Sequence, residues 1–452
     1  MKTIFIPIFQ GIEAKNILRT DIFNILRGQP YVRIVLFVSN QEKKEYFSRE
    51  FFGDNIIYEV LEKYKQPGLN RFFTFLKYNL LNTHRMDIRR RVELTADNNY
   101  LKYYLKLIFN RIFARPTWRR LTRWLDFKLV KDNNFKEIFD KYRPDLVLLA
   151  HLFGDVEISM LREAKKRNII SVGLINSWDK ITSRCIIRLL PNKLIVHNNI
   201  IKAEALEHVD IAGRDIEIVG IPHYDMYISR QASPKEVFYK KICTDINRVI
   251  LLFCPTGQFF SDIDAEMINI ISDLQVKKLI PADMQILLRF PPNDAVDLTN
   301  LKNKDKLIIQ QPGVRFSKKR GIDWDMNDAD NQHLLDTLYY SSLVVCPPSS
   351  MSVDAAVFDK PVINLKFRRT KEKYTNQNIN LFYDTDHYKK IIDTGGVKVV
   401  HDEQELLTWI NKYLADPAID RAGRQRIVHD QCWRLDGQAG KRAVHFLLNL
   451  IK

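Results

Sequence analysis

Cysteine is scarce in this sequence, which has five cysteines among 452 residues. They are scattered, odd in number, and never spaced as a C-x-x-C pair: Cys185, Cys243, Cys254, Cys346 and Cys432. This distribution argues against a disulfide framework and against a structural zinc site. We therefore expect a protein of a reducing compartment, the cytoplasm.

Long apolar runs are also missing. No uninterrupted apolar stretch reaches the roughly 18 residues that a helix needs to cross a bilayer, so no transmembrane helix is expected. The apolar run near the N-terminus is followed at once by Glu13 and Lys15 and is too short for a signal-peptide core. The motifs G-x-G-x-x-G, G-x-x-x-x-G-K-[ST], H-E-x-x-H and G-x-S-x-G do not occur either. Nicotinamide, P-loop, zinc-protease and serine-hydrolase chemistry therefore lack their signatures.

Positive charge, in contrast, is abundant, with a formal net charge of +16. Most of it lies between Asn70 and Lys131, where fifteen Lys or Arg stand against four Asp or Glu among many aromatic residues. A basic amphipathic helix in this segment would suit an anionic membrane surface, where each basic residue contributes about 1 kcal/mol. The alternative is a pair of ordinary helices packed on a sheet, and no motif favours nucleic acid. Five apolar residues of the segment follow helical spacing: Leu101, Tyr104, Leu105, Ile108 and Ile112.

Short apolar runs rich in Ile, Val and Phe alternate with helical patterns in two successive blocks, seven runs in the first and six in the second. Such runs are typical of buried parallel strands. The alternation predicts an α/β fold with parallel sheets, and two blocks predict two domains. The predicted division is 1–225 for the first domain, with a basic helical insertion at about 66–131, then a linker at 226–245, the second domain at 246–430 and a C-terminal helix at 431–452 that crosses back.

The stretch SSMSVDAAVFDKPVINL, which begins at Ser349, follows the apolar run LVVCPP and predicts a turn, a short helix and another buried strand. Ligands of open parallel sheets bind outside the carboxyl ends of the strands, where the start of a helix offers backbone N–H groups to an anion. The hydroxyls of Ser349, Ser350 and Ser352 add donors at this turn. We therefore predict a phosphate or diphosphate cradle, with Asp354 placed to accept hydrogen bonds from a ribose. The alternative is an ordinary serine N-cap.

Three segments in order, LLRFPPND, DTLYYSSLVVCPPSSMSVDAAVFDKPVINL and LDGQAGKRAVHFLL, resemble the C-terminal nucleotide-binding half of GT-B fold glycosyltransferases. They look most like the bacterial enzymes of surface-polysaccharide synthesis that border on the CDP-glycerol glycerophosphotransferase family. The resemblance extends from about Pro144 to Leu447. It implies two Rossmann-like domains whose parallel sheets face a cleft, with a nucleotide diphosphate held mostly by the second. It also implies that no metal or cofactor is needed, the nucleotide-sugar being a co-substrate.

The same resemblance places the serine turn at the diphosphate and Asp354 at the ribose, where many relatives have the longer Glu. Arg289 in LLRFPPND would neutralise negative charge on the leaving phosphate. Phe290 stands where relatives carry His, so any role of that histidine in the family cannot be assigned to this chain. Thr256 and Gly257, after the first strand of the second domain, could bring backbone N–H groups close to a phosphate.

An inverting transfer also needs a base, because an acceptor hydroxyl must lose its proton as it attacks the anomeric carbon. The candidates follow buried strands of the first domain: Asp179 in NSWDKIT first, then His151 and Asp155 in LLAHLFGDVE. The structural alternatives are a turn residue for Asp179, a core histidine for His151 and a helix N-cap for Asp155.

The sequence thus predicts a bacterial glycosyltransferase, cytoplasmic and peripheral on the inner face of the cell membrane, that moves a sugar from a nucleotide donor to a cell-surface glycan or a polyprenyl-linked acceptor. Its expected partners are the nucleotide-sugar, the acceptor and an anionic membrane surface, with no nucleic acid. Three alternatives stay open. They are transfer of a polyol phosphate from a CDP-activated donor, 2-epimerisation of a nucleotide-sugar, and a non-catalytic scaffold that binds glycolipid.

Overall fold

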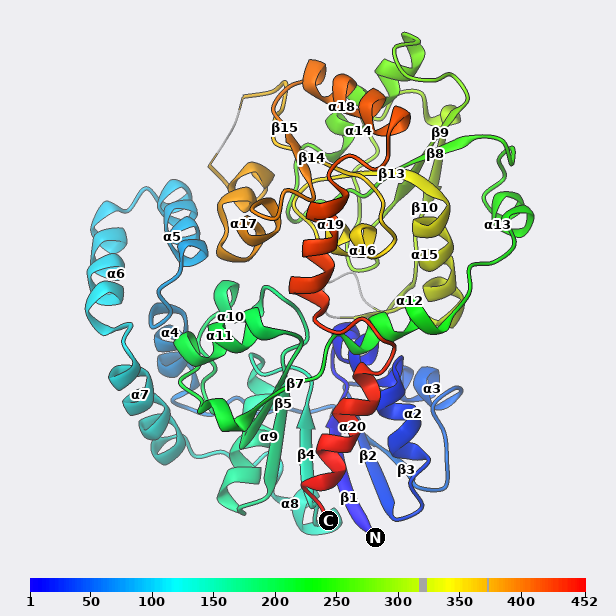
Figure 1. Ribbon diagram of the computed structural model, residues 1–452. Coiled ribbons are helices and arrows are strands. Elements are labelled where there is room, and N and C mark those ends of the chain that lie inside the picture. The colour runs from blue at the N-terminus through cyan, green and yellow to red at the C-terminus, as the bar shows by residue number, and fades with distance from the viewer. Residues whose placement is uncertain (317–322, 372–373) are drawn as a thin grey trace. The chain divides into compact units, whose positions relative to one another are not determined.

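The computed structural model describes residues 1–316, 323–371 and 374–452, which form two compact units (Figure 1). The first unit comprises Met1–Asp87, Asn99–Ile228 and Cys432–Lys452, and the second comprises Ile88–Asn98 and Ser229–Gln431. The chain therefore returns to the first unit for its last residues. Each unit is built on one large parallel sheet.

The first unit contains a seven-stranded parallel sheet with the strand order β3-β2-β1-β4-β5-β6-β7. The order reverses between β1 and β4, because β2 and β3 are added on one side of β1 and the later strands on the other. All seven strands fall on the seven apolar runs of the first block, so that prediction is confirmed. They are β1 (Lys2–Pro7), β2 (Val32–Val38), β3 (Ile56–Val60), β4 (Leu146–Leu149), β5 (Ile170–Leu174), β6 (Lys193–Val196) and β7 (Ile216–Ile218).

The second unit contains a six-stranded parallel sheet with the order β10-β9-β8-β13-β14-β15, which reverses between β8 and β13. Its strands match the six runs of the second block: β8 (Val249–Phe253), β9 (Met284–Arg289), β10 (Leu307–Gln310), β13 (Ser341–Cys346), β14 (Val362–Leu365) and β15 (Lys398–Val400). An antiparallel pair was not expected from the sequence, since each of its strands is too short to show a period: β11 (Val314–Arg315) and β12 (Trp324–Asp325).

Helices connect the strands of both sheets. Several begin after a residue whose side chain accepts a backbone N–H of the first turn, as Thr20, Asn40 and Asn198 do before α2, α3 and α11. The first unit has α1 (Gly11–Glu13), α2 (Asp21–Arg27), α3 (Gln41–Ser48), α4 (Asn70–Asn79), α6 (Tyr100–Phe113), α7 (Pro116–Leu129), α8 (Lys136–Tyr142), α9 (Asp155–Lys166), α10 (Lys180–Ser183), α11 (Asn199–His208), α12 (Asp225–Ser229) and α20 (Ala439–Asn449). The second has α13 (Lys235–Lys241), α14 (Asp264–Val276), α15 (Asp328–Tyr340), α16 (Met351–Val357), α17 (Asp386–Ile392), α18 (Glu403–Ala415) and α19 (Arg421–Ile427); α5 (His84–Asp97) contributes to both.

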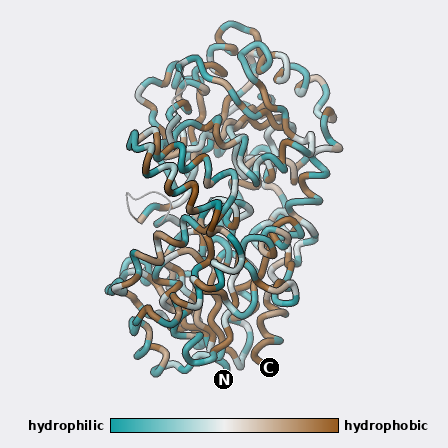
Figure 2. The backbone as a smooth tube through the Cα atoms, turned by 90° about the vertical axis from the view of Figure 1, so that its left-hand side faces the viewer, coloured by the Kyte–Doolittle hydropathy of each residue, from teal (hydrophilic) through white to brown (hydrophobic). Residues whose placement is uncertain are grey.

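Alternate residues of the first sheet enter different apolar layers, as the two-residue period of a strand requires. Ile4 and Ile6 of β1 pack in the layer that contains residues of α2 and α20, whereas Phe5 packs in the layer that contains residues of α8 and α9. Hydrophobic and hydrophilic stretches consequently alternate along the backbone (Figure 2). The sheet is therefore covered on both faces.

The C-terminal helix α20 lies beside α2 in the first unit (Figure 1). Val444 and Leu447 of α20 belong to the apolar core of that unit. Asp225 accepts hydrogen bonds from the N–H groups of Ala439 and Gly440 at 3.0 and 2.8 Å, and so caps the start of the helix. The predicted return of the last helix to the first domain is confirmed.

The basic insertion is anchored by buried ion pairs. Asp126 of α7 accepts hydrogen bonds from Arg162 at 2.6 Å and from Arg188 at 2.7 Å, and all three side chains are 1% exposed. Asp210 pairs in the same way with two arginines of α7, at 2.6 Å each. Part of the positive charge of the insertion is therefore internal. Four of its basic residues are buried: Lys77, Arg90, Arg119 and Arg123.

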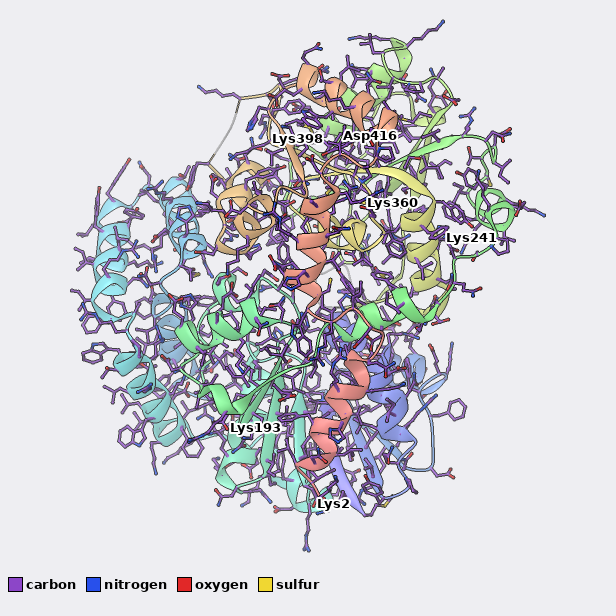
Figure 3. All side chains as sticks on the ribbon, in the orientation of Figure 1. Lys2, Lys193, Lys241, Lys360, Lys398 and Asp416 are labelled. Atoms are coloured by element: carbon purple, nitrogen blue, oxygen red, sulfur yellow. The ribbon has the colours of Figure 1, made fainter. Side chains whose placement is uncertain are left out.

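Lysines elsewhere make local contacts on the surface of their own unit (Figure 3). Lys193, at the start of β6, pairs with Asp215 at 2.7 Å. Lys398 of β15 lies over the ring of Trp409, 4.2 Å from its centroid. Contacts of this kind contribute little to stability and mark no site.

Candidate functional site

All three predicted bases lie at the carboxyl edge of the first sheet. His151 and Asp155 follow β4, and Asp179 follows β5. The strand order reverses between β1 and β4 at this edge. Ligands of open α/β sheets bind outside the carboxyl ends of the strands at such a reversal. The fold therefore brings the predicted bases to the place where this class of sheet binds ligands.

His151 is buried, and its Nδ1 has no hydrogen-bond partner among the described residues. Burial lowers the pKa of His151 well below its usual value, and the charges of Lys180, Arg184 and Lys77 lower it further. The imidazole is therefore neutral at pH 7. Because its protonated form is unfavourable here, it accepts a proton poorly. A role for His151 as the base stays a prediction.

Asp155 is the first residue of α9, and Gly154 is the N-cap residue. Its carboxylate accepts a hydrogen bond from Asn70 at 2.9 Å and lies 3.8 Å from Lys77 and 3.7 Å from Arg188. These contacts tie α9 to α4 and its surroundings. They give Asp155 a structural task, and its catalytic role stays a prediction.

Asp179 directly precedes α10, and its side chain is half-buried. One carboxylate oxygen accepts the hydroxyl of Ser177 at 2.5 Å and the other accepts that of Ser183 at 3.0 Å. The two serines fix the direction of the carboxylate. Asp179 stays the first choice for the base, because its half-buried carboxylate is held in a defined direction by two hydroxyl donors.

The sequence interpretation missed a pair of glutamates at the same edge. Glu13, at the end of α1, and Glu157, in the first turn of α9, are both buried, and the charge of Glu157 contributes to raising the pKa of Glu13. Burial is the largest cause that raises the pKa of Glu157 to about 7 and the pKa of Glu13 well above its usual value. No local signal marks either residue. They lie at the same edge of the sheet because β1 and β4 are neighbouring strands.

Further buried polar atoms at this edge have no hydrogen-bond partner in the described part of the chain: Asn16 Oδ1, His197 Nε2 and His223 Nδ1. Buried polar atoms are nearly always paired, so these atoms are open to a ligand or to water. Burial, with a smaller effect of Lys15, lowers the pKa of His197 to about 4 and that of His223 well below its usual value. Both imidazoles are therefore neutral at pH 7.

The predicted donor-binding residues lie at the carboxyl edge of the second sheet. Arg289 ends β9, and the other predicted residues follow β8 and β13, between which the strand order reverses. The guanidinium of Arg289 is buried and donates to Gln310 Oε1 at 3.0 Å and to the carbonyl of Asp330 at 3.4 Å. It is therefore held in a defined position beside the reversal.

Thr256 and Gly257 follow β8, but their backbone N–H groups are already engaged. They donate to the carboxylate of Asp264, at 3.3 Å from Thr256 and 2.8 Å from Gly257. Burial raises the pKa of Asp264 to about 6 despite these bonds. A phosphate could use the two N–H groups only by displacing Asp264, so the predicted role of this loop stays a prediction and requires a rearrangement.

The serine turn after β13 is built differently from the simple cradle that the sequence suggested. Ser352 is fully buried, and its hydroxyl is bonded to Tyr388 at 2.9 Å and to Asn364 at 3.4 Å, so it is not available to a ligand. Ser349 Oγ accepts the N–H of Met351 at 3.2 Å. Ser350 precedes α16 with an exposed side chain that makes no capping bond.

Asp354 is buried in the first turn of α16. Its negative charge contributes to raising the pKa of the thiols of Cys254 and Cys346, although burial is the main cause for both. Asp354 and Arg289 both act on Cys254, in opposite directions. Both residues therefore lie near the buried thiol of Cys254.

His333 of α15 is a second residue that the sequence interpretation missed. Burial and, to a smaller extent, the charge of Arg289 lower the pKa of His333 to about 4. Its Nδ1 is buried without a hydrogen-bond partner among the residues that the structure describes. No signal in the sequence links it to Arg289, because the two lie in different elements.

In the described ranges, no group of three or more His, Cys, Asp or Glu is arranged to hold a metal ion. None of the described helices has the length and apolar character to cross a membrane. A surface hollow of about 430 Å³ along α20 contains none of the predicted residues; its lining includes Glu217, Lys441, Arg442 and His445.

The insertion presents an unusual surface on α6 and α7. The five residues of α6 that the sequence predicted to form an apolar face are between 50% and 72% exposed. Exposed lysines and arginines flank them, among them Lys102, Arg111, Arg115 and Arg120. We call this surface the α6–α7 face, and it consists of Leu101, Tyr104, Leu105, Ile108, Ile112, Trp118, Leu121 and Trp124 together with those four basic residues.

Comparisons with known proteins identify the fold. No protein-family model matches the chain, and no curated protein matches it. Among solved structures, the UDP-GlcNAc 2-epimerase of Neisseria meningitidis bound to UDP-GlcNAc is similar, with a TM-score of 0.55, 11% identity and coverage of 99% of this chain and 100% of that one. A glycosyltransferase of Rickettsia africae is similar with a TM-score of 0.51 and 12% identity over 100% and 99% of the two chains. The wall teichoic acid polymerase TagF is similar with a TM-score of 0.51 and 10% identity, over 100% of this chain and 88% of that one.

These likenesses span the whole chain. The protein has the two-domain, Rossmann-like GT-B fold, and the fold class expected from the sequence is confirmed. These structural neighbours are a 2-epimerase, a glycosyltransferase and a wall teichoic acid polymerase. At such low identities the likeness establishes the fold alone, because one fold supports many reactions.

Proposed function

We propose that this protein is a metal-independent glycosyltransferase that moves a sugar from a nucleotide-sugar to a cell-surface glycan or a lipid-linked acceptor. It works in the cytoplasm, at the inner face of the membrane. The observation that carries the proposal is the α6–α7 face, which belongs to the unit that the resemblance assigns to the acceptor. An enzyme that acts on a membrane-bound acceptor needs such a face.

The donor side of the proposal uses the carboxyl edge of the second sheet. Arg289 balances the charge of the leaving diphosphate, Ser349 and Ser350 face the diphosphate, and Asp354 meets the ribose. The fixed guanidinium of Arg289 and its shared effect with Asp354 on Cys254 support this assignment. The structures of neighbours with UDP and with UDP-GlcNAc support a nucleotide-sugar as the co-substrate.

The acceptor side uses the carboxyl edge of the first sheet. The acceptor hydroxyl attacks the anomeric carbon, the bond from that carbon to the diphosphate breaks, and Asp179 takes the hydroxyl proton. The contacts of Asp179 with Ser177 and Ser183 support this choice, because the two hydroxyl donors hold the carboxylate in a defined direction. His151 and Asp155 are the next candidates.

Location at the membrane rests on the chemistry of the α6–α7 face. Exposed apolar patches of more than a few hundred Å² are rare on monomeric proteins unless they bind a partner. Here aromatic and aliphatic side chains are flanked by lysine and arginine, the combination that binds anionic bilayers. The lipid surface would also bring the enzyme to a polyprenyl-linked acceptor.

Epimerisation is the second candidate, because the Neisseria meningitidis neighbour is named as a 2-epimerase. That reaction needs a nucleotide-sugar but neither an acceptor nor a membrane. The α6–α7 face would then have no use. Transfer of a polyol phosphate from a CDP-activated donor, and a non-catalytic glycolipid scaffold, are distinguished by the same experiment.

The test begins with thermal unfolding of the purified protein in the presence of UDP, GDP, CDP, CMP and their sugar conjugates. A ligand at a hundred times its dissociation constant stabilises the native state by about 2.7 kcal/mol. We expect one nucleotide family to stabilise the wild type, and neither Arg289→Ala nor Asp354→Ala to respond. Arg214→Ala, which removes an exposed arginine of the first unit, serves as the control and should respond as the wild type does.

Product analysis then separates the reactions. Transfer requires an acceptor and releases a nucleoside diphosphate, epimerisation proceeds without an acceptor, and polyol-phosphate transfer leaves phosphorus in the new linkage. Full transfer activity in both Arg289→Ala and Asp354→Ala would overturn the donor site. Turnover of the nucleotide-sugar without an acceptor would overturn the transferase.

A further inference from the structure

Gln310 is the last residue of β10 and stands beside Arg289, the last residue of the neighbouring strand β9 (Figure 1). The two residues are partners in the parallel register of the strands. Both therefore lie at the carboxyl edge of the second sheet, where ligands of open α/β sheets bind. The proposed chemistry uses Arg289 but gives Gln310 no task.

Two hydrogen bonds hold the buried guanidinium of Arg289. Its Nη1 donates to Gln310 Oε1 at 3.0 Å, and its Nη2 donates to the backbone carbonyl of Asp330 at 3.4 Å. The carboxylate of Asp330 is turned elsewhere and accepts the N–H of Asn327 at 3.1 Å. Both acceptors of the guanidinium are neutral oxygens, so these two bonds fix its direction without cancelling its positive charge.

The bond to Arg289 also fixes the orientation of the Gln310 amide. A guanidinium has donors only, so the amide oxygen must face it and the amide nitrogen must face another direction. Nε2 of Gln310 is buried and has no hydrogen-bond partner among the described residues. A buried N–H without an acceptor costs free energy, and native proteins nearly always pair such groups. Gln310 therefore offers N–H donors to an acceptor from outside the described chain, next to a buried positive charge.

His333 of α15 adds a second polar atom of this kind. It follows one helical turn after Asp330, whose carbonyl accepts the guanidinium of Arg289. Its Nδ1 is buried and makes no hydrogen bond within residues 1–316, 323–371 and 374–452. The imidazole is neutral at pH 7, because burial and the charge of Arg289 lower the pKa of His333 to about 4. The surroundings of Arg289 are thus neutral and polar, with hydrogen-bonding capacity left over.

We infer that Gln310 binds the donor: its amide oxygen holds Arg289, and its amide nitrogen donates a hydrogen bond to an oxygen of the donor's diphosphate. This role deepens the proposed function and rests on it. The oxygens of a diphosphate are negatively charged acceptors, so they match a guanidinium and an amide N–H that lie side by side. A bound diphosphate supplies the acceptor that Nε2 of Gln310 lacks in the chain itself.

The test uses inorganic pyrophosphate as the probe and measures its Kd by calorimetric titration. Gln310→Met removes both the bond to Arg289 and the N–H donor, and should raise the Kd about tenfold or more, as expected for a lost hydrogen bond to a charged group. Gln310→Glu keeps an oxygen for Arg289 but places a second oxygen where Nε2 stands. We expect it to bind pyrophosphate more weakly than Gln310→Met, because the new carboxylate repels the anion.

The neighbouring glutamine provides a control that is matched in charge. Gln311 is exposed, and its Nε2 donates to the carbonyl of Pro291 at 3.3 Å. Gln311→Glu adds the same negative charge one residue away and should bind pyrophosphate within about twofold of the wild type. If Gln310 only holds Arg289, then Gln310→Glu, which keeps that bond, binds pyrophosphate at least as tightly as Gln310→Met. That order would overturn the contact with the diphosphate.

Two further measurements report on the contact directly. In a crystal structure with pyrophosphate bound, Nε2 of Gln310 should lie within hydrogen-bond distance of a phosphate oxygen, and a longer separation would overturn the inference. In the transfer assay, Gln310→Met should raise KM for the nucleotide-sugar and leave KM for the acceptor unchanged. Thermal unfolding without ligand checks that each variant is folded before its affinity is compared.

The outcomes distinguish this inference from the proposed function. If pyrophosphate binds the wild type but not Arg289→Ala, and both Gln310 variants bind it as the wild type does, the role of Gln310 is wrong and the donor site stands. If the wild type binds neither pyrophosphate nor any nucleoside diphosphate, the proposed donor site is wrong, and the role of Gln310 is wrong with it.

Discussion

Removing the carboxylate of Asp126 should destabilise the first unit strongly. Three hydrogen bonds reach this carboxylate, one from Arg162 and two from Arg188, at 2.6, 2.7 and 3.1 Å. All three side chains are 1% exposed, so water cannot replace the lost partner. Breaking a buried pair by removing one member costs about 3–5 kcal/mol, because the other charge stays buried without compensation.

This cost can be converted into a melting temperature. For a domain of 150–250 residues, 1 kcal/mol shifts Tm by about 2–4 °C, so Asp126→Ala should lower the melting temperature of the first unit by about 6–20 °C. Circular dichroism during heating measures the shift. Asp87→Ala is the matched control, because its pair with Arg111, at 2.7 Å, is partly exposed and should contribute about 1 kcal/mol or less.

The same experiment can refute the reasoning. If Asp126→Ala melts within about 2 °C of the wild type, the buried network does not anchor α7 as described. Hydrogen exchange adds a local readout. The amides of α7 should exchange faster in Asp126→Ala than in Asp87→Ala, since α7 loses one of its buried anchors only in Asp126→Ala.

Three further predictions test the surface and the packing. The double variant Leu105→Glu, Ile108→Glu should stop binding to vesicles that contain anionic lipid, because both side chains are more than half exposed on the α6–α7 face. The control Val237→Glu, at a 55% exposed position of the second unit, should bind as the wild type does. Equal binding by all three proteins in a flotation assay would exclude this face as the membrane-binding surface. Burial raises the pKa of Asp264 to about 6, so the stability that this group contributes is fully present below about pH 4 and is lost as the pH rises through 6, by about 3 kcal/mol in total. Urea unfolding of the wild type and of Asp264→Asn should show this loss only in the wild type. A Cβ on Gly423 would lie 2.3 Å from backbone of the facing loop, so Gly423→Ala should cost about 1–3 kcal/mol in chemical unfolding, and an unchanged midpoint would contradict that packing.

The large sheets could be predicted from the sequence because their strands are short, nearly continuous apolar runs. A strand covered on both faces requires such a run, and the runs therefore identified every strand of both parallel sheets. The β11–β12 pair escaped because two-residue strands carry no period. The apolar face of α6 could also be predicted, since helical spacing alone defines it. Whether that face is exposed depends on what packs against the helix.

The candidate site was only partly predictable. The positions of Arg289, Asp354 and Asp179 at the carboxyl edges of the sheets could be predicted because each lies at or just beyond an apolar run, where the carboxyl end of a strand was expected; their roles stay predictions. The engagement of Thr256 and Gly257 by Asp264, in contrast, depends on the path of a loop. A local pattern identifies which strand a residue follows, but not which donors its neighbours have already taken.

By itself, the sequence determined the local elements of this protein: where the strands run, where the helices begin, and which residues stand at the strand ends. Only the tertiary structure decided which strand ends are neighbours, and hence that Glu13 and Glu157 lie at the same edge of the first sheet. The physical reason is that periodicity and capping act within a few residues. Hydrogen bonds, desolvation and charge pairing between distant residues depend on the order of the strands in the sheet.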